Sequence, residues 1–502
     1  HMQQLQLNYD IPLDKIPFLN FITATYAYTG DFDWQRGSEV LNEVAGEDLN
    51  TIQNASTHNL NASFGMDKLY SYLGLKRKTG TTANQSSRGA LPIADPDQEQ
   101  APAEIKTKKY GGYNTMIDLV TMVKRINLSY TSNTGKVLPG YTESVGFIGT
   151  LRPSWGFVFG SQSDVRYEAA QKGWLTTFPE FNQQYMSREA TQLNISANVQ
   201  PFRDLTIDLV ADRQYSESYA ENYKIEDING DGIFDYNALI QNQYGDFSIS
   251  TIMIGTSFDQ TKEESSETFN QFSKNRILIA QRLAGEPENP DAADYPVGYG
   301  PTNQAVLLPA FIAAYTGKNA SSVSLGAFRD TPIPNWTVKY TGLMRMQWFK
   351  DNFRRFSLAH GYRSSYSINS FRSNLDYGKG SQFDQSGNYK NEILYTNATL
   401  VEQFNQLIRM DFEMNNSVSV LAEMRKDRAL SLSFDNNLLT EMAGNEYVVG
   451  LGYRIPDLRF VTNIGGRRNV LKGDLNLKAD LSLRDNITVI RNLDSNTNQV
   501  TA

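Results

Sequence analysis

The stretch EDINGDGIFD, from Glu226 to Asp235, holds the residues whose spacing most suggests metal chemistry. Its oxygen-bearing side chains fall at positions 1, 3, 5 and 9 of the EF-hand count, and they are Asp227, Asn229, Asp231 and Asp235. Gly232 takes the sixth position, but Ala238 stands where an EF-hand has its bidentate Glu. Two interpretations follow: a weak Ca²⁺ site that stiffens one loop, or a plain turn built on Asx and Gly residues.

Other reactive groups are scarce. The chain of 502 residues has no Cys and three His, and His1 with Met2 is expected to be vector-derived. His58 is expected on a polar face or in a turn, and His360 at an interface within a strand. Because the sequence has no G-x-S-x-G, H-E-x-x-H or phosphate-loop motif, we expect no enzymatic activity and, Ca²⁺ aside, no cofactor. A formal charge of -8 without a long basic run makes nucleic acid an unsuitable partner.

In the segments that carry these residues, apolar and polar side chains alternate with a period of two residues. Apolar side chains alternate with polar ones from Ile22 to Trp34, and again near residues 60–66, 126–130, 193–211, 336–340, 356–362 and 408–483. Short turns are expected between them, for example EMNNS, RKDR and LRDN. This pattern predicts an all-β fold, an antiparallel up-and-down meander of hairpins.

Strand length favours a transmembrane β-barrel, of which this chain would be a segment. Several predicted strands reach ten residues, and the faces between the apolar positions carry Asn, Asp, Arg, Ser and Lys, which suits a wet lumen. The longest apolar run, Ala305 to Tyr315, is too short for a spanning helix. A large soluble β-sheet remains the alternative, because its strands alternate in the same way.

Two segments interrupt the meander. The polar, proline-containing residues 79–109 predict a flexible loop. Residues 261–327 predict a helical insert, because Phe269, Phe272, Arg276, Ile279 and Leu283 follow helical spacing; Ser265 or Ser266 is placed to cap the start and Gly285 the end. A second helix is expected from Gln304 to Tyr315. The predicted organisation is therefore vector residues 1–2, barrel strands 3–78, loop 79–109, strands 110–260, insert 261–327 and strands 328–502.

A basic cluster, Lys76, Arg77 and Lys78, follows the apolar run LYSYLGL. Two placements fit it. Cations beside apolar residues suit a boundary with lipid headgroups, and a solvated strand end is the alternative.

Long, unusual strings carry a resemblance to a known family. They include IPFLNFITATYAYTGDFDWQRG, LPGYTESVGFIGTLRPSWGFVFGSQSDVRYEAAQKGWLT, FRDTPIPNWTVKYTGL, FRRFSLAHGYRSSYSINSF, EMRKDRALSLSFDNNLLTEMAGNEYVVGLGYRI and GDLNLKADLSLRDNITVIRNLD. In these strings, spread from Ile16 to about Val500, the chain resembles the SprA/Sov family. That family forms the outer-membrane translocon of the type IX secretion system, which is linked to gliding motility. Because the chain is far shorter than the translocon, the resemblance implies a C-terminal segment of its barrel.

The resemblance implies a protein-conducting channel in the outer membrane of a Gram-negative bacterium of the Bacteroidota type. The expected partners are secreted cargo proteins, a PorV-like barrel subunit, a plug protein and outer-membrane lipids. Two other functions stay open at this point: a TonB-dependent, SusC-like nutrient importer, and a soluble surface adhesin stabilised by Ca²⁺.

Overall fold

We describe the protein from a computed structural model, in which residues 1–77, 111–145, 149–259, 266–292, 294–464, 467–495 and 497–501 are described. Fourteen strands of these ranges form one sheet. Their bounds are β1 Met2–Ile11, β2 Ile22–Gln35, β3 Asn50–Gly65, β4 Val123–Tyr141, β5 Gln184–Phe202, β6 Leu205–Glu226, β7 Asp235–Ser250, β8 Asn335–Tyr340, β9 Phe353–Ser373, β10 Ile393–Met414, β11 Val418–Ser433, β12 Leu438–Ile464, β13 Arg467–Asn492 and β14 Asn498–Thr501. The predicted all-β class is confirmed.

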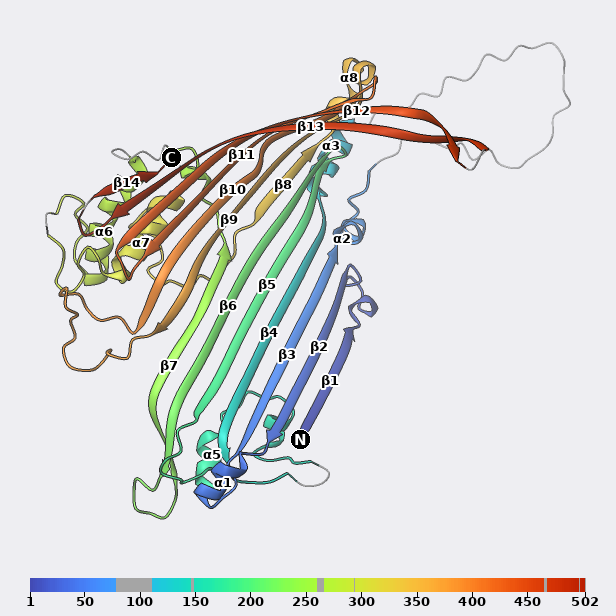
Figure 1. Cartoon of the computed structure of the whole chain (residues 1–502). Helices are drawn as coiled ribbons and strands as arrows, with labels where there is room; N and C mark the ends of the chain where they lie inside the picture. The colour runs from blue at the N-terminus through green and yellow to red at the C-terminus, as the bar shows by residue number, and fades with distance from the viewer. Residues whose placement is uncertain are drawn as a thin grey trace, which may run out of the picture.

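The sheet is an antiparallel meander, in which most strands pair with their neighbours in sequence. Figure 1 shows the strands running from β1 at one side to β12 and β13 at the other, all tilted in the same sense. Within the described residues no pairing joins β1 to β14, so the sheet has two edges. The up-and-down topology predicted from alternating residues is therefore the observed one.

Helices gather at the two ends and on one face of the sheet. Their bounds are α1 Glu39–Ala45, α2 Met66–Tyr72, α3 Gly111–Val120, α4 Trp155–Val158, α5 Arg166–Gln171, α6 Glu267–Ala284, α7 Gln304–Thr316 and α8 Gln347–Asn352, with 3-10 turns η1 Leu13–Lys15, η2 Ile254–Thr256 and η3 Gly342–Arg345. In the orientation of Figure 1, α2, α3 and α8 lie at the upper end, and α1 and α5 at the lower end. None of the described helices is long and apolar enough to cross a bilayer.

One position in the sheet, between β6 and β9, is shared by two strands. β7 occupies its lower part, with Ile249 opposite Arg213, and β8 occupies its upper part, with Asn335 opposite Val210. The chain leaves the sheet after Ser250, forms α6 and α7, and returns at Asn335 in the same direction. The helical insert is therefore built into the middle of one strand position.

Side chains replace the missing backbone partners at this break. Ser250 Oγ accepts a hydrogen bond from the backbone N–H of Asp212 at 3.0 Å. Asn335 Oδ1 accepts from the N–H of Ser364 at 2.8 Å, and Asn335 Nδ2 donates to the Ser364 carbonyl at 3.2 Å. Unpaired backbone groups inside a sheet are costly, so these two side chains allow the strand to be interrupted.

The helices of the insert have the predicted ends. The Ser266 hydroxyl accepts from the N–H of Phe269 at the start of α6, and Gly285, with φ 70°, ends that helix. Asn303 caps α7 in the same way, through Ala305 N–H at 2.8 Å. Both helices fall inside residues 261–327, as predicted, but the strands around them end at Ser250 and resume at Asn335, so the excursion is wider.

Two predicted turns are wrong. RKDR, residues 425–428, lies inside β11, and LRDN, residues 483–486, lies inside β13. Their charged side chains pair across neighbouring strands, which lets the strands continue. The EMNNS turn is confirmed, since β10 ends at Met414 and β11 begins at Val418. The loop predicted at residues 79–109 lies outside the described residues, as does Lys78.

Candidate functional site

One face of the sheet carries a continuous row of apolar side chains near its upper end; we call this row the apolar belt. Directly opposed residues of antiparallel strands point to the same face, so the strand register identifies its members. They are Tyr9, Ile11, Ala24, Tyr26, Leu60, Ala62, Phe64, Ile126, Leu128, Tyr130, Leu193, Ile195, Ala197, Leu205, Ile207, Leu209, Trp336, Val338, Tyr340, Phe356, Leu358, Ile408, Met410, Phe412, Val418, Val420, Ala422, Tyr447, Val449, Leu451, Tyr453, Leu475, Leu477, Leu481 and Leu483.

Much of the belt is uncovered. Leu477 is 51% exposed and Leu481 63%, and Val449 and Leu451 on the adjacent strand are about half exposed. Exposed apolar patches of this extent mark a surface that meets a partner or a membrane. Aromatic residues stand at its upper rim, where Trp348 on α8 packs against Phe349 and Phe353.

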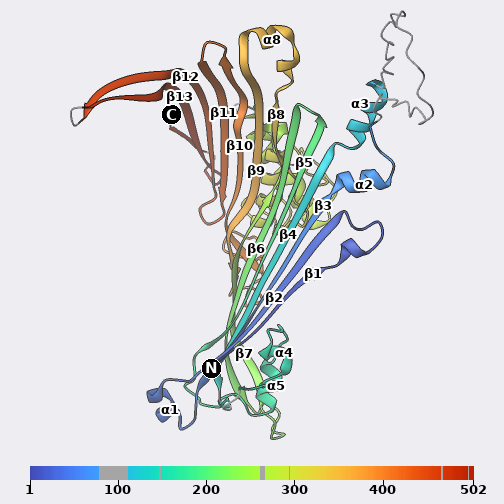
Figure 2. The same cartoon turned by 90° about the vertical axis from the view of Figure 1, so that its right-hand side faces the viewer.

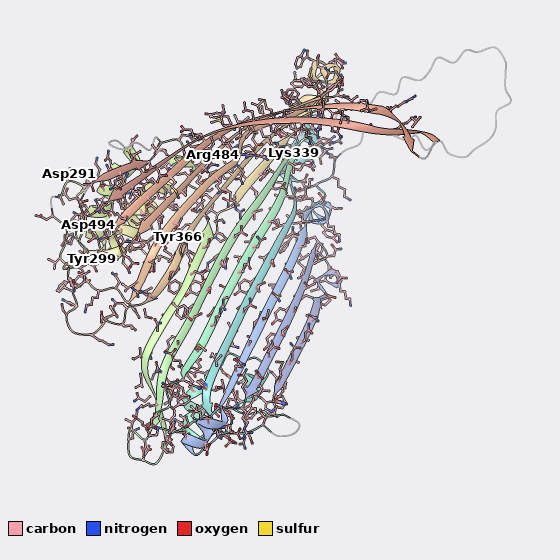
Figure 3. All side chains as sticks on the ribbon, in the orientation of Figure 1. Asp291, Tyr299, Lys339, Tyr366, Arg484 and Asp494 are labelled. Atoms are coloured by element: carbon pink, nitrogen blue, oxygen red, sulfur yellow. The ribbon has the colours of Figure 1, made fainter. Side chains whose placement is uncertain are left out.

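The opposite face is mostly polar, with few exposed apolar side chains such as Met186, Val210 and Met442; we call it the polar face. Short side chains hydrogen bond across neighbouring strands there: Ser63 donates to Asn127 at 2.8 Å, and Ser129 donates to Asn61 at 2.8 Å. Figure 3 shows the side chains that line both faces of the sheet. The two faces thus differ in chemistry, as a boundary between an apolar and an aqueous medium requires.

Charges on the polar face are arranged in a ladder across β10 to β13. Arg409 and Arg425 both contact Glu423, at 3.0 and 2.6 Å. Arg425 continues to Glu446 at 3.3 Å, and Arg484 pairs with Asp427 at 2.8 Å. Each of these cations has a carboxylate within reach, so this part of the polar face has little net charge.

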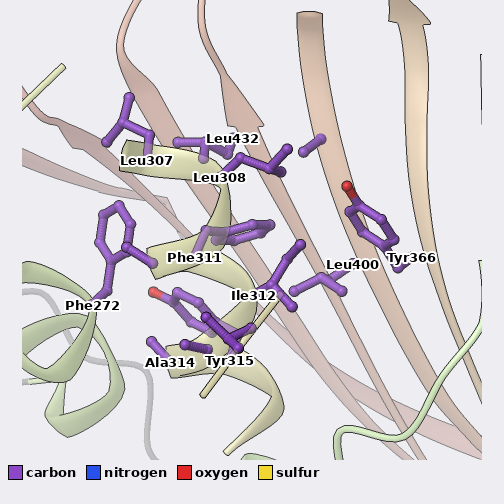
Figure 4. Close-up of a cluster of buried hydrophobic side chains, with 14 of the residues drawn as sticks. Phe272, Leu307, Leu308, Phe311, Ile312, Ala314, Tyr315, Tyr366, Leu400 and Leu432 are labelled. Carbon is purple, nitrogen blue, oxygen red and sulfur yellow. The ribbon is translucent and has the colours of Figure 1, made fainter. Parts of the chain in front are cut away.

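Below the belt, the same face is covered by helices. Phe272 of α6 and Phe311 of α7 have no exposed surface, and they pack with Leu400, Leu430 and Leu432 of the sheet. Figure 4 shows α7 lying across these strands with its side chains directed both at α6 and at the sheet. A helix that is apolar on all sides is buried on all sides, and α7 fits this rule. A second core, around α4 and α5, covers the lower part of β2 to β7.

A buried polar network fixes the insert to the sheet. Glu402 accepts hydrogen bonds from Ser257 at 2.6 Å and Tyr362 at 2.8 Å, and its second oxygen lies 3.2 Å from Arg428. Arg428 donates to the backbone and the hydroxyl of Thr256, at 2.8 and 2.9 Å. Because both charged side chains are buried, each depends on the other to offset its loss of water.

A second buried contact lies at the end of α7. The Tyr315 hydroxyl donates to Glu441, which also contacts Arg491 at 3.2 Å. Burial, with the Glu441 charge adding to it, raises the pKa of Tyr315 well above its ordinary value. The tyrosine therefore stays protonated and acts as a donor, which suits a structural contact.

The Asp227 loop joins β6 to β7. The Asp227 carboxylate accepts from the backbone N–H groups of Gly230, Asp231 and Gly232, at 2.7, 3.2 and 3.0 Å. Asn229 donates to Asp235 at 3.2 Å, and Asp231 accepts from Ile233 N–H. Gly230 and Gly232 have φ of 70° and 81°, which glycine adopts without strain. Within the described residues no three His, Asp or Glu side chains converge as metal ligands; Ca²⁺ binding stays a prediction.

The two internal histidines lie within strands. His58 is in the middle of β3, where its Nδ1 lies 2.8 Å from the Tyr26 hydroxyl. The expectation of a turn or polar-face position is wrong, because His58 shares the face of Tyr26 and Tyr28. His360 is on β9 as predicted, with its Nδ1 2.8 Å from the Leu407 carbonyl.

The sequence did not point to the buried pairs, whose partners lie far apart in the chain, such as Glu402 with Ser257. In comparisons with known proteins, no protein-family model matches the chain, and no curated protein is significantly similar to it.

Proposed function

We propose that this chain forms part of the wall of a protein-conducting channel in the outer membrane of a Gram-negative bacterium of the Bacteroidota type. The observation that carries the proposal is the contrast between the apolar belt and the polar face of one continuous sheet. On β13 the belt runs from Leu475 to Leu483, roughly 26 Å at about 3.3 Å per residue. At the tilt of about 35–45° that strands of outer-membrane barrels have, this stretch spans about 20 Å of bilayer, close to their apolar band of about 25 Å. On the neighbouring strands the belt is shorter, as on β4, where it runs from Ile126 to Tyr130.

The breadth of the sheet supports a wide channel. Barrel diameter grows with the number of strands, and these strands form a broad sheet whose edges do not meet within the described residues. The charge ladder of Arg409, Glu423, Arg425 and Glu446 pairs opposite charges across β10 to β12 of the polar face, which suits passage of a folded protein without tight binding to this part of the face. The resemblance to the SprA/Sov family supports the same function, and with it cargo proteins, a PorV-like subunit and a plug protein as partners.

Insertion into a bilayer tests the proposal. The full chain, refolded from denaturant into phosphatidylcholine vesicles, is expected to float with them, to resist extraction at alkaline pH and to migrate on a gel in a heat-modifiable way. In a planar bilayer, large and poorly selective conductance steps are expected. Monodisperse protein with a full β signal in plain buffer would contradict the membrane proposal.

A further inference from the structure

A cavity of about 330 Å³ opens at the upper end of the sheet, between α2, α3 and the turn that joins β5 to β6. Its charged lining consists of Lys76, Arg77, Lys124, Arg203, Asp67 and Asp118. Buried Ile117 and Tyr70 contribute apolar lining. Four cations and two carboxylates therefore share one small space.

Two of the cations are neutralised within the protein. Arg77 donates to both oxygens of Asp118, one of them at 2.5 Å from Nε. This contact lowers the pKa of Asp118, so its carboxylate stays ionised. Lys124 lies 3.4 Å from Asp67. With the rest of the described chain, Lys76 and Arg203 form no ion pair, and both are exposed. The lining thus carries an excess of two positive charges, and Arg203 also acts electrostatically on Asp118.

The surroundings of the cavity are apolar. Leu73 beside α2, Met116 on α3 and Phe202 at the end of β5 are 64%, 70% and 48% exposed. The apolar belt begins immediately below, at Phe64 and Leu205. Figure 2 shows α2 and α3 projecting beside the upper ends of β3 and β4. The charged groups therefore stand at the border of the apolar surface, beside side chains able to enter the acyl region.

From this arrangement we infer that the α2–α3 cavity binds the phosphate of an anionic lipid headgroup, with Lys76 and Arg203 as the principal cationic contacts. The inference rests on the proposed function, because it requires the belt to lie in a bilayer. A phosphate headgroup carries its charge a few ångströms above acyl chains, and the exposed Leu73, Met116 and Phe202 supply contacts for those chains. Free inorganic phosphate would contact only the two cations and would leave the three apolar side chains without a ligand.

The test compares three forms of the full chain: the parent, a K76Q/R203Q variant, and a K224Q/K379Q control that removes two exposed cations from loops and strands at the lower end. Each is inserted into vesicles of phosphatidylcholine with a minor fraction of phosphatidylglycerol, and the lipid retained after mild detergent extraction is counted by native mass spectrometry. The parent and the control are expected to retain phosphatidylglycerol selectively. K76Q/R203Q is expected to bind it roughly 30-fold more weakly, while its far-ultraviolet circular dichroism stays unchanged.

Three results would overturn the inference. Equal retention of phosphatidylglycerol by all three forms, with normal insertion, removes the lipid site and leaves the proposed function intact. Displacement of phosphatidylglycerol by inorganic phosphate identifies a free-phosphate site instead. Failure of every form to insert into either phosphatidylcholine or mixed vesicles overturns the proposed function and the lipid site with it.

Discussion

The upper and lower parts of the same sheet face are built from the same alternating pattern, yet they end in opposite environments. In the lower part, Leu400 and Leu432 have no exposed surface, because α6 and α7 lie on them. In the upper part, Leu477 and Leu481 are more than half exposed. An alternating strand therefore specifies an apolar face, but the residues that the structure describes cover only part of it. We propose that lipid covers the rest.

Truncating a side chain in the lower part of the face, which α6 and α7 cover, should lower stability more than truncating one in the apolar belt. Phe311→Ala is expected to lower the free energy of unfolding by about 3–5 kcal/mol, because the surrounding core cannot fill the cavity. Leu481→Ala, in the apolar belt, is expected to cost about 0.5 kcal/mol, as at other exposed positions. Guanidinium unfolding of both variants in the same detergent micelles measures the difference. Similar losses for both would mean that the belt is packed as tightly as the core.

The two parts also contain different kinds of ion pair. Arg428→Ala leaves Glu402 buried without its cation, and the expected loss is about 3–5 kcal/mol. Arg484→Ala breaks exposed pairs with Asp427 and Glu446 on the polar face, at an expected cost of about 0–1 kcal/mol. Thermal unfolding of the two variants under identical conditions checks this. An equal effect of the two changes would show that the Glu402 network does not fix the insert.

Replacing an apolar side chain of the belt by a charged one should weaken insertion into a membrane. Leu477→Lys is expected to destabilise the inserted state by about 2–4 kcal/mol, the cost of a cation near the bilayer midplane. Asn476→Lys adds the same charge to the adjacent residue on the polar face, and we expect it to insert as the parent does. The fraction of protein that floats with vesicles gives the comparison. If both variants insert equally, the belt does not contact lipid.

A small effect is expected at the Asp227 loop, whose side chains are exposed. Asp231→Ala removes one hydrogen bond, worth about 0.5–1.5 kcal/mol, and, if Ca²⁺ binds, one ligand. Calorimetric titration with Ca²⁺ compares the parent with the variant. Heat in the parent that disappears in Asp231→Ala supports the weak site, and no heat in the parent excludes it.

The sequence was sufficient to predict the all-β class, many of the strands and the two helices of the insert, because these depend on local patterns. It did not predict the short helices α1 to α5 and α8, which lie in ranges expected to be strands. Alternation from Ile22 to Trp34 specifies β2, and Ser266 and Gly285 mark the ends of α6. The two wrong turn predictions have a common physical cause. Arg425 and Arg484 look like turn residues along the chain, but neighbouring strands supply Glu423 and Asp427 as partners, and the strands continue.

The candidate surfaces could be predicted only in part. The apolar belt can be predicted from the alternation of apolar and polar residues along the strands. Its exposure cannot, because it depends on which strands the helices cover. The Glu402 and Arg428 network joins segments as much as 172 positions apart, as in the contact of Arg428 with Thr256. Such contacts depend on register and folding, and no local pattern encodes them. The strand break at Ser250 and Asn335 was missed for the same reason.

That break has a consequence for the order of folding. β8 can complete the strand position of β7 only after residues 251–334 have been brought into a loop, and closing a flexible loop of that length costs roughly 4 kcal/mol of chain entropy. If α6 and α7 pack first, the ends of the loop are already close. The burial of apolar side chains between the two helices then offsets most of the entropy cost of closing the loop. Until then β6 keeps an unpaired edge along Leu205 to Val210, which is open to wrong pairing. The insert would thus act as a folding nucleus for the sheet that surrounds it.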